Sequence, residues 1–221
     1  MSEQELLIED INVWDTRMFA LNNPEHSRLK QPLLDAIYRL RDAQSQAIES
    51  EVAPGAKHAL FESTLELLEQ PDPAIQDLKS FLEEMLTMVA TAVNQEFWPQ
   101  GAQAEASIVE SWFHVTEDGG YHDTHSHPNC SWCGIYYVDA GECDLGNRNG
   151  INRFYDPRAG ADQYLDAGTA YLNGTGTWDF AAMEGQIVIF PSYLKHAAMP
   201  YFGKKDRVVI AFNSRVNFIE S

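Results

Sequence analysis

The chain has 221 residues, of which 15 are lysine or arginine and 33 are aspartate or glutamate, giving a formal net charge of −18 at pH 7. Such an acidic surface repels phosphate backbones and anionic lipid, which argues against general nucleic-acid or membrane-surface binding. Hydrophobic residues make up 44% of the sequence, enough for a packed core, yet no apolar run approaches the ~20 residues that span a bilayer.

The first hundred residues are rich in leucine, alanine, glutamate and glutamine, and they predict helices. One helix is expected from Gln31 to Glu51, before the Pro54-Gly55 pair. Another is expected to begin after Asp72, which can cap it, with Pro73 in its first turn. Its apolar residues recur every three or four positions, the spacing of one buried helix face. They are Ile75, Leu78, Leu82, Met85, Val89 and Val93.

From about Glu105 onward the sequence changes to short β-type runs separated by Gly, Asn, Asp and Pro. The expected strands are 107–115, 132–138, 186–190 and 208–212, while 147–176 reads as long loops with one short strand at 169–172. Many short strands without intervening helices suggest a sandwich or a small barrel. We therefore expect a helical N-terminal segment, residues 1–104, packed on a β core, residues 105–221, as one compact unit.

Four of the seven histidines fall in two segments of the β core. If residues 122–127 are extended, His125 and His127 point to the same side with Cβ atoms about 7 Å apart, close enough to converge on one ion. His196, just after a hydrophobic strand, would be a third ligand and leave open positions on the metal. Asp123 lies two residues before His125 and would face the same side of an extended strand, so Asp123 with His125 is a competing pair of metal ligands. Spacing leaves this choice open, because positions 123 and 127 would lie about 13 Å apart on a straight strand.

A series of short motifs runs through the same half of the chain. In order they are Gly120-Tyr121-His122, His125-Ser126-His127-Pro128-Asn129, Gly134-Ile135-Tyr136-Tyr137-Val138, Asp156-Pro157-Arg158, Gly185-Gln186-Ile187-Val188-Ile189-Phe190-Pro191-Ser192 before His196, and Arg207 before Ala211-Phe212-Asn213. Together they resemble the signature of a group of 2-oxoglutarate and Fe(II)-dependent oxygenases. The resemblance covers roughly residues 107–216.

The resemblance implies a mainly β fold, the double-stranded β-helix or jelly roll of the cupin type, with iron at its open end. In the wider superfamily the metal ligands are His-x-Asp or His-x-Glu and a distal histidine. Here His127 stands at the carboxylate position, so the implied iron ligands are His125, His127 and His196. Losing an anionic ligand makes the iron site more positive.

The resemblance also implies a clamp for the second carboxylate of 2-oxoglutarate, a basic residue about ten positions after the distal histidine. Arg207 lies 11 positions after His196 and fits this role, since guanidinium pairs bidentately with carboxylate. The hydroxyl that often follows two residues later is replaced by Val209, so Asn213 or Tyr136 is expected to support the cosubstrate instead. The other cations considered are Lys195, Arg153 and Arg158.

The implied activity is that of a 2-oxoglutarate- and Fe(II)-dependent dioxygenase, a hydroxylase acting on a small molecule or a protein side chain. One alternative is a three-histidine cupin-type metalloenzyme that does not use 2-oxoglutarate; another is a non-catalytic jelly roll that binds a metal or ligand. Arg207 distinguishes the 2-oxoglutarate-dependent oxygenase from the three-histidine enzyme, because only a dicarboxylate cosubstrate requires a basic clamp. Exposed strand edges of jelly rolls commonly pair, so a homodimer is expected.

The remaining features are less decisive. Trp112, Tyr121, Trp132 and Tyr137 would be pocket walls or, by preference, core residues. Cys130-Ser131-Trp132-Cys133 forms a C-x-x-C, but no second such motif exists and the context is not that of thioredoxin, which favours structural cysteines. Three cysteines are too few for a disulfide framework, and the acidic N-terminus lacks the order of a signal peptide. We expect a soluble cytoplasmic protein.

Overall fold

The structure is a computed structural model that describes residues 15–45, 57–158, 166–168, 170 and 176–219. Its described strands form one antiparallel sheet in the order β1-β7-β4-β9-β3-β8-β5-β6, with β2 also paired to β3. The elements in chain order are β1 (Phe19–Asn22), α1 (His26–Ser45), β2 (Lys57–Glu62), the 3-10 helix η1 (Leu67–Glu69), α2 (Pro73–Asn94), the 3-10 helix η2 (Gln95–Phe97), β3 (Ala104–His125), β4 (Trp132–Asp139), β5 (Asn152–Tyr155), β6 (Thr177–Phe180), β7 (Gln186–Pro191), β8 (His196–Tyr201) and β9 (Arg207–Phe218).

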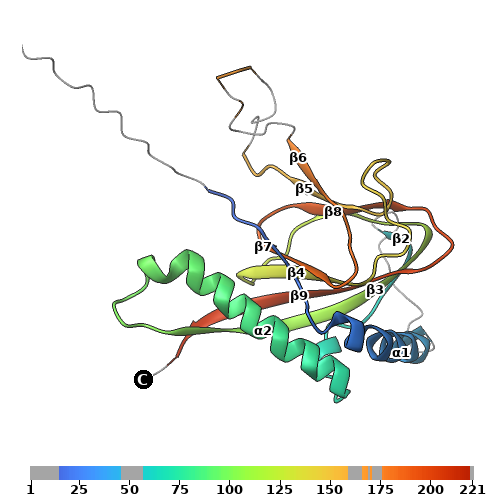
Figure 1. The fold of residues 1–221 in the computed structure, drawn as a ribbon, viewed down its shortest axis with the longest axis horizontal. Helices are drawn as coiled ribbons and strands as arrows, with labels where there is room; N and C mark the ends of the chain where they lie inside the picture. Colours follow the sequence, from blue (N-terminus) through green and yellow to red (C-terminus); the bar gives the residue numbers. More distant parts are fainter. Residues whose placement is uncertain (1–14, 46–56, 159–165, 169, 171–175, 220–221) are drawn as a thin grey trace, which may run out of the picture.

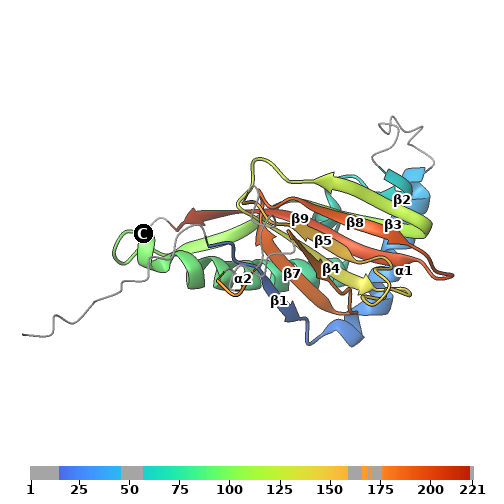
Figure 2. The ribbon, with the colours of Figure 1, turned by 90° about the horizontal axis from the view of Figure 1, so that it is seen from above.

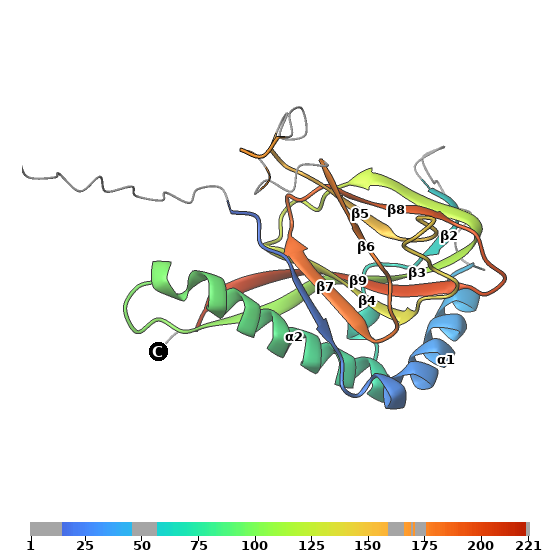
Figure 3. The same ribbon diagram turned by 45° about the horizontal axis from the view of Figure 1, so that its top comes forward.

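The sheet curls over itself, as Figure 1 and Figure 3 show. Strands β8, β5 and β6 lie over one face of the β7-β4-β9-β3 region, and α1 and α2 cover the other face. Figure 2, seen from above, shows the upper strands crossing in front of β4 and β9. This is the mainly β jelly roll that the family resemblance implies, with the N-terminal helices that the sequence predicts.

Successive side chains of β9 point alternately into two different hydrophobic cores. Val208, Ile210 and Phe212 pack in the cluster that includes the buried faces of α1 and α2. Arg207 and Val209 point the other way, into the interior enclosed by the curled sheet. The period of two in a strand thus gives one strand a helix-facing core and a cavity-facing row.

Helix α2 forms as its sequence predicts. Asp72 accepts a hydrogen bond from the amide of Ala74 at 3.0 Å, and Pro73 occupies the first turn. The helix buries a continuous apolar face against the sheet: Ala74, Ile75, Leu78, Leu82, Leu86, Val89 and Ala90. Helix α1 begins at His26, five residues earlier than predicted, and the end of its predicted range lies outside the described residues.

The four predicted strands exist, but each is longer in the structure, and β3 extends over 22 residues. Strands β1, β2, β5, β6 and β8 are not predicted, because each has only four to six residues among turn-forming neighbours. The strand expected at 169–172 falls largely outside the described residues. No helix in the described part of the chain is long and apolar enough to cross a membrane.

Candidate functional site

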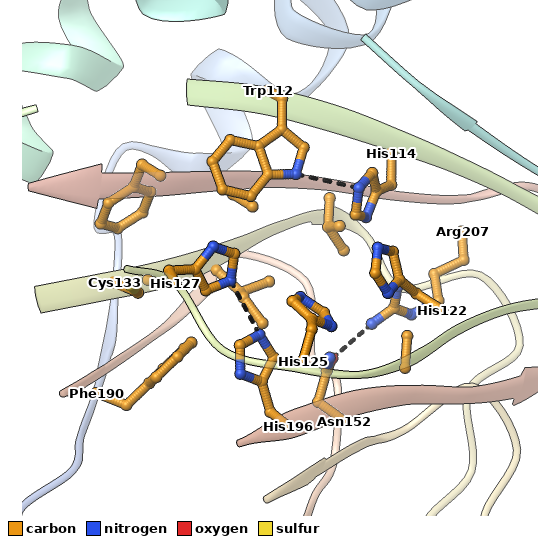
Figure 4. A pocket seen from close by; sticks show the side chains of 16 residues that line it. Trp112, His114, His122, His125, His127, Cys133, Asn152, Phe190, His196 and Arg207 are labelled. Atoms are coloured by element: carbon orange, nitrogen blue, oxygen red, sulfur yellow. Dashed lines mark hydrogen bonds between the residues drawn. The ribbon is translucent and has the colours of Figure 1, made fainter. Parts of the chain in front are cut away.

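Three histidines meet at one end of the curled sheet. His125 ends β3, His196 begins β8, and the two residues are directly opposite in the β3–β8 ladder. His127 follows in the loop after β3, and its Nε2 lies 3.3 Å from Nε2 of His196 (Figure 4). One ring nitrogen from each histidine lies within 4.8 Å of the others. The structure therefore brings together the three histidines that the sequence analysis selects.

Hydrogen bonds fix the orientation of two of these rings. Nδ1 of His125 lies 2.7 Å from the carbonyl oxygen of Asp123, and Nδ1 of His196 lies 3.1 Å from that of Leu194. A carbonyl oxygen only accepts, so each Nδ1 donates its proton and each Nε2 keeps a free lone pair. This is the outer-shell arrangement that orients histidine ligands in metal sites.

The three rings are neutral at pH 7. Burial, together with neighbouring histidines, lowers the pKa of His125 and of His127 to about 4. Burial also lowers the pKa of His196 to about 3. Metal ligation requires the neutral imidazole, so the donor set fits a divalent cation that accepts nitrogen ligands.

Asp123 does not join this cluster. Its side chain is exposed, and its carboxylate accepts a hydrogen bond from the amide of Thr124 at 2.7 Å. The β3–β8 pairing shifts register between His122 and His125, so the segment is not the straight strand that the sequence argument assumed. Among the described residues, the rival pair of Asp123 with His125 does not form a shared donor group.

Arg207 lies deeper in the interior, at the start of β9, and only 2% of its surface is exposed. Its Nη2 donates to Oδ1 of Asn152 at 2.6 Å, and its guanidinium carbon lies 5.5 Å from the centre of the Tyr137 ring. Its Nε is buried without a hydrogen-bond partner, and no ion pair joins Arg207 to a described carboxylate. Burying an unpaired cation is costly, which indicates a place for an anion.

The other cations considered in the sequence are already engaged or exposed. Arg153 forms a bidentate pair with Asp179, at 2.7 and 2.8 Å. Arg158 pairs with Asp156 at 2.6 Å, and Lys195 is exposed. Arg207 is thus the cation of this group that lines the cavity shared with the three histidines.

Thr116 is a residue that the sequence analysis missed. It lies directly opposite Arg207 in the β3–β9 ladder, and its Oγ1 is buried without a partner. Two buried donors, Oγ1 of Thr116 and Nε of Arg207, therefore lack acceptors on neighbouring strands. The available signal was the two-residue spacing of Trp112, His114 and Thr116 along the strand, which places all three on one face of β3.

The structure corrects the two supporting residues expected for the cosubstrate. Tyr136 faces the helices, where its hydroxyl lies 2.7 Å from Nδ1 of His26. Tyr137 faces the interior instead, and its hydroxyl donates to Oδ1 of Asn152 at 2.7 Å. Asn213 is six residues along β9 from Arg207, about 20 Å in an extended strand, so the two cannot hold one carboxylate.

Two cavities meet at the histidines. The inner one is narrow, about 30 Å³, and reaches from the three histidines to Asn152 and Arg207. The outer one is about 650 Å³ and shares Trp112, His122, His125 and His127 with it. The other residues lining the outer cavity are Lys57, Glu62, Leu65, Val109, Glu110, Pro128, Asn129, Asn213 and Arg215.

A polar pair also escaped the sequence analysis: half-buried Glu62 of β2, which lines the outer cavity, and buried His114 of β3, which lines the inner one. Oε2 of Glu62 lies 2.8 Å from Nε2 of His114, and Lys57 pairs with the same carboxylate group. Burial opposes ionisation of Glu62, but hydrogen bonds from His114 and Lys57 outweigh it and lower its pKa to about 2. Glu62 is therefore anionic and neutralised by Lys57 at the cavity edge.

The open end of the jelly roll thus combines three neutral histidines that could hold a metal ion with a buried arginine whose Nε has no partner, deep in the same cavity. Residues 110–213 match the model of the family described as "Putative 2OG-Fe(II) oxygenase". Residues 110–213 therefore carry a 2OG-Fe(II) oxygenase domain, the domain of enzymes that use iron and 2-oxoglutarate.

Several solved structures share the fold of this chain. A prolyl-4-hydroxylase from Pseudomonas putida is 15% identical, with a TM-score of 0.55 over 90% of this chain and 92% of that chain. HygX from Streptomyces hygroscopicus, solved with nickel and 2-oxoglutarate, is 13% identical, with a TM-score of 0.59 over 90% and 83%. A prolyl hydroxylase from Trichoplax adhaerens, in complex with a hypoxia inducible factor peptide fragment, gives the same values. At these identities the likeness shows the fold. A comparison with curated proteins gives no match.

Proposed function

We propose that the enzyme is a hydroxylase in which His125, His127 and His196 hold Fe(II), and Arg207 with Thr116 holds the distal carboxylate of 2-oxoglutarate. The observation that carries the proposal is Arg207, a buried cation with an unpartnered Nε in the cavity that the three histidines also line. A three-histidine enzyme without 2-oxoglutarate would have no use for this charge at this depth.

The side chains around Arg207 either hold its guanidinium in place or offer a further hydrogen-bond donor. Tyr137 and Arg207 both donate to Oδ1 of Asn152, which holds the guanidinium in place and leaves its Nε free. Thr116 offers a hydroxyl donor from the opposite strand. When bound, Fe(II) and 2-oxoglutarate supply oxygen activation coupled to decarboxylation of the cosubstrate, and the apolar walls keep water away from that chemistry.

The inner cavity must widen to admit a five-carbon dicarboxylate, and His122 is the side chain to move. Its ring centre lies 4.1 Å from that of His125 and 5.7 Å from that of His114, so it separates the metal centre from the interior. His122 belongs to a part of β3 where the register with β8 shifts on both sides. Rotation of this ring toward the outer cavity would open the path to Arg207.

The outer cavity is the place for the hydroxylated substrate. Its volume of about 650 Å³ suits a small molecule or a side chain of a peptide, and Trp112 lines it beside the metal centre. Structures of this fold have been solved with hygromycin B and with a peptide fragment, so a small molecule and a peptide are both compatible with the fold. Neither a nucleic acid nor a membrane fits the charge of the chain.

Anaerobic titration of the Fe(II)-loaded enzyme with 2-oxoglutarate, followed by the visible absorbance band of the chelate, tests the proposal. Arg207→Ala should weaken 2-oxoglutarate binding by about 2–5 kcal/mol, the usual cost of removing one partner of a buried charge pair. Fe(II) affinity without cosubstrate should hardly change. Arg153→Ala, which removes an arginine already paired with Asp179, is the matched control and should bind as the unmodified enzyme does. Absence of the band at saturating 2-oxoglutarate would overturn the proposal.

A further inference from the structure

Two thiols lie in contact beside the metal centre. Sγ of Cys130 and Sγ of Cys133 are 3.5 Å apart, and both cysteines are free. Cys130 is half-buried and reachable from solvent, whereas Cys133 is buried and lines the inner cavity. A disulfide bond needs a separation of about 2.05 Å, so the two sulfur atoms must approach by about 1.5 Å to form one.

Both thiols contact groups of the functional site. Sγ of Cys130 lies 3.6 Å from the carbonyl oxygen of His127. Sγ of Cys133 donates to Oδ1 of Asn213 at 3.1 Å, and Nδ2 of Asn213 donates to Glu110 at 2.7 Å in the outer cavity. The pair thus bridges a proposed metal ligand and the wall of the proposed substrate cavity.

The two cysteines differ in how firmly the backbone holds them. Cys133 lies in β4, paired with Phe190 of β7 on one side and Asn213 of β9 on the other. Cys130 lies in the loop between β3 and β4, which also carries His127. Closing the bond would therefore draw Cys130 toward Cys133, and the loop segment from His127 to Cys130 would move with it.

We propose that Cys130 and Cys133 form a thiol–disulfide exchange site whose oxidation displaces His127 and weakens metal binding. The oxidant is a low-molecular-weight disulfide such as glutathione disulfide. The thiolate of Cys130 attacks one sulfur and releases one thiol; the thiolate of Cys133 then attacks Cys130 of the mixed disulfide and releases the second thiol. The pair loses two protons and two electrons, and the reagent disulfide becomes two thiols. The coupling to metal binding rests on His127 being a ligand, as proposed above.

Equilibration of the full-length, metal-free protein in buffers of varied glutathione redox ratio tests the exchange site. Alkylation followed by peptide mass mapping should show a Cys130–Cys133 disulfide that forms and disappears reversibly. Cys143→Ser should leave this transition unchanged, because Cys143 bonds the carbonyl oxygen of Gly150 elsewhere. Cys130→Ser should abolish it. If both thiols stay fully alkylatable at every ratio, or appear only as glutathione adducts, the exchange site is overturned.

Anaerobic Co(II) titration, followed by its visible absorbance, tests the coupling without any measurement of turnover. In the Cys143→Ser background, the oxidised form should bind Co(II) about 10- to 100-fold more weakly than the reduced form, the range seen when groups that orient a metal ligand are disturbed. Cys130→Ser should bind like the reduced form under either treatment. Equal affinity of the two forms would overturn the coupling. A protein that binds no Co(II) in either form would overturn the metal centre and leave the disulfide measurement standing.

Discussion

At the scale of single residues, the positions of protons on the histidine rings decide what the metal centre can bind. The backbone carbonyls of Asp123 and Leu194 hold the Nδ1 protons of His125 and His196, and they direct the Nε2 lone pairs toward one another. Asp123 thus orients His125 through its main-chain carbonyl, while its side-chain carboxylate accepts a hydrogen bond from the amide of Thr124. Replacing Asp123 removes its carboxylate but keeps the carbonyl oxygen that orients His125. Substitutions of Asp123 and of His127 can therefore show whether His125 is joined by His127 or by Asp123 at the metal.

His127→Ala should abolish stoichiometric Fe(II) binding, because it removes one of three neutral nitrogen donors. Asp123→Ala should keep most of it, because the carbonyl oxygen that orients His125 is unchanged. Metal analysis of the purified variants, with circular dichroism to confirm folding, measures both. Iron retention by His127→Ala, combined with loss in Asp123→Ala, would instead support the pair of Asp123 with His125.

Thr116→Val should have opposite effects on the free and the loaded enzyme. It replaces an unpartnered buried hydroxyl by a methyl group, so the metal-free protein should gain about 1 kcal/mol of unfolding free energy. It should also weaken 2-oxoglutarate binding by about 1.5–3 kcal/mol, the range for a hydrogen bond to a charged group. Urea unfolding and the chelate titration measure the two effects, and Thr116→Ser is the control that keeps the hydroxyl. Unchanged 2-oxoglutarate affinity in Thr116→Val would exclude a contact with the carboxylate.

At the scale of secondary-structure elements, the cap of α2 is a local determinant of stability. Asp72→Ala removes the acceptor for the amide of Ala74 and should cost about 1 kcal/mol of unfolding free energy. Asp72→Asn keeps a capping oxygen but removes the charge that pairs with exposed Arg39, so it should cost much less. Denaturant unfolding of the two variants distinguishes the contribution of the capping hydrogen bond from that of the ion pair. Equal losses of unfolding free energy in both variants would show that the ion pair with Arg39 matters more.

The same elements show what sequence reasoning can reach. Local signals, such as the Asp72-Pro73 cap and the three- and four-residue spacing, predict α2 because a helix is made of contacts within one segment. Tyr136 and Tyr137 could not be assigned to faces, because β4 is buried on both sides and shows no polar alternation. The pairing of Glu62 with His114 was out of reach because it depends on the long-range contact of β2 with β3. Spacing drew attention to His125, His127 and His196 but left Asp123 as a rival, and Arg207 was selected only through the resemblance of the motifs to the oxygenase family.

At the scale of the whole molecule, a net charge of −18 surrounds a cavity that must accept a dianion. The field of the whole chain repels 2-oxoglutarate at long range, while buried Arg207 attracts it only at short range. Added salt screens exposed charges more than buried ones. The association rate constant of 2-oxoglutarate should therefore rise between low and physiological ionic strength, measured by stopped-flow absorbance at constant pH. A rate that falls with salt would show that the cavity mouth has an attractive field.

The division of β9 between two cores has a consequence for changing this enzyme in the laboratory. Val208 and Ile210 pack in the helix-facing core, Val209 and Ala211 line the inner cavity, and Phe212 contributes to both. Libraries that randomise Val208 and Ile210 would explore thermostability, and libraries that randomise Val209 and Ala211 would explore substrate scope, within four consecutive positions and with Arg207 kept. Because the two sets alternate along one strand, adjacent members can couple through the shared backbone, and double-mutant cycles would measure how far gains from separate selections combine additively.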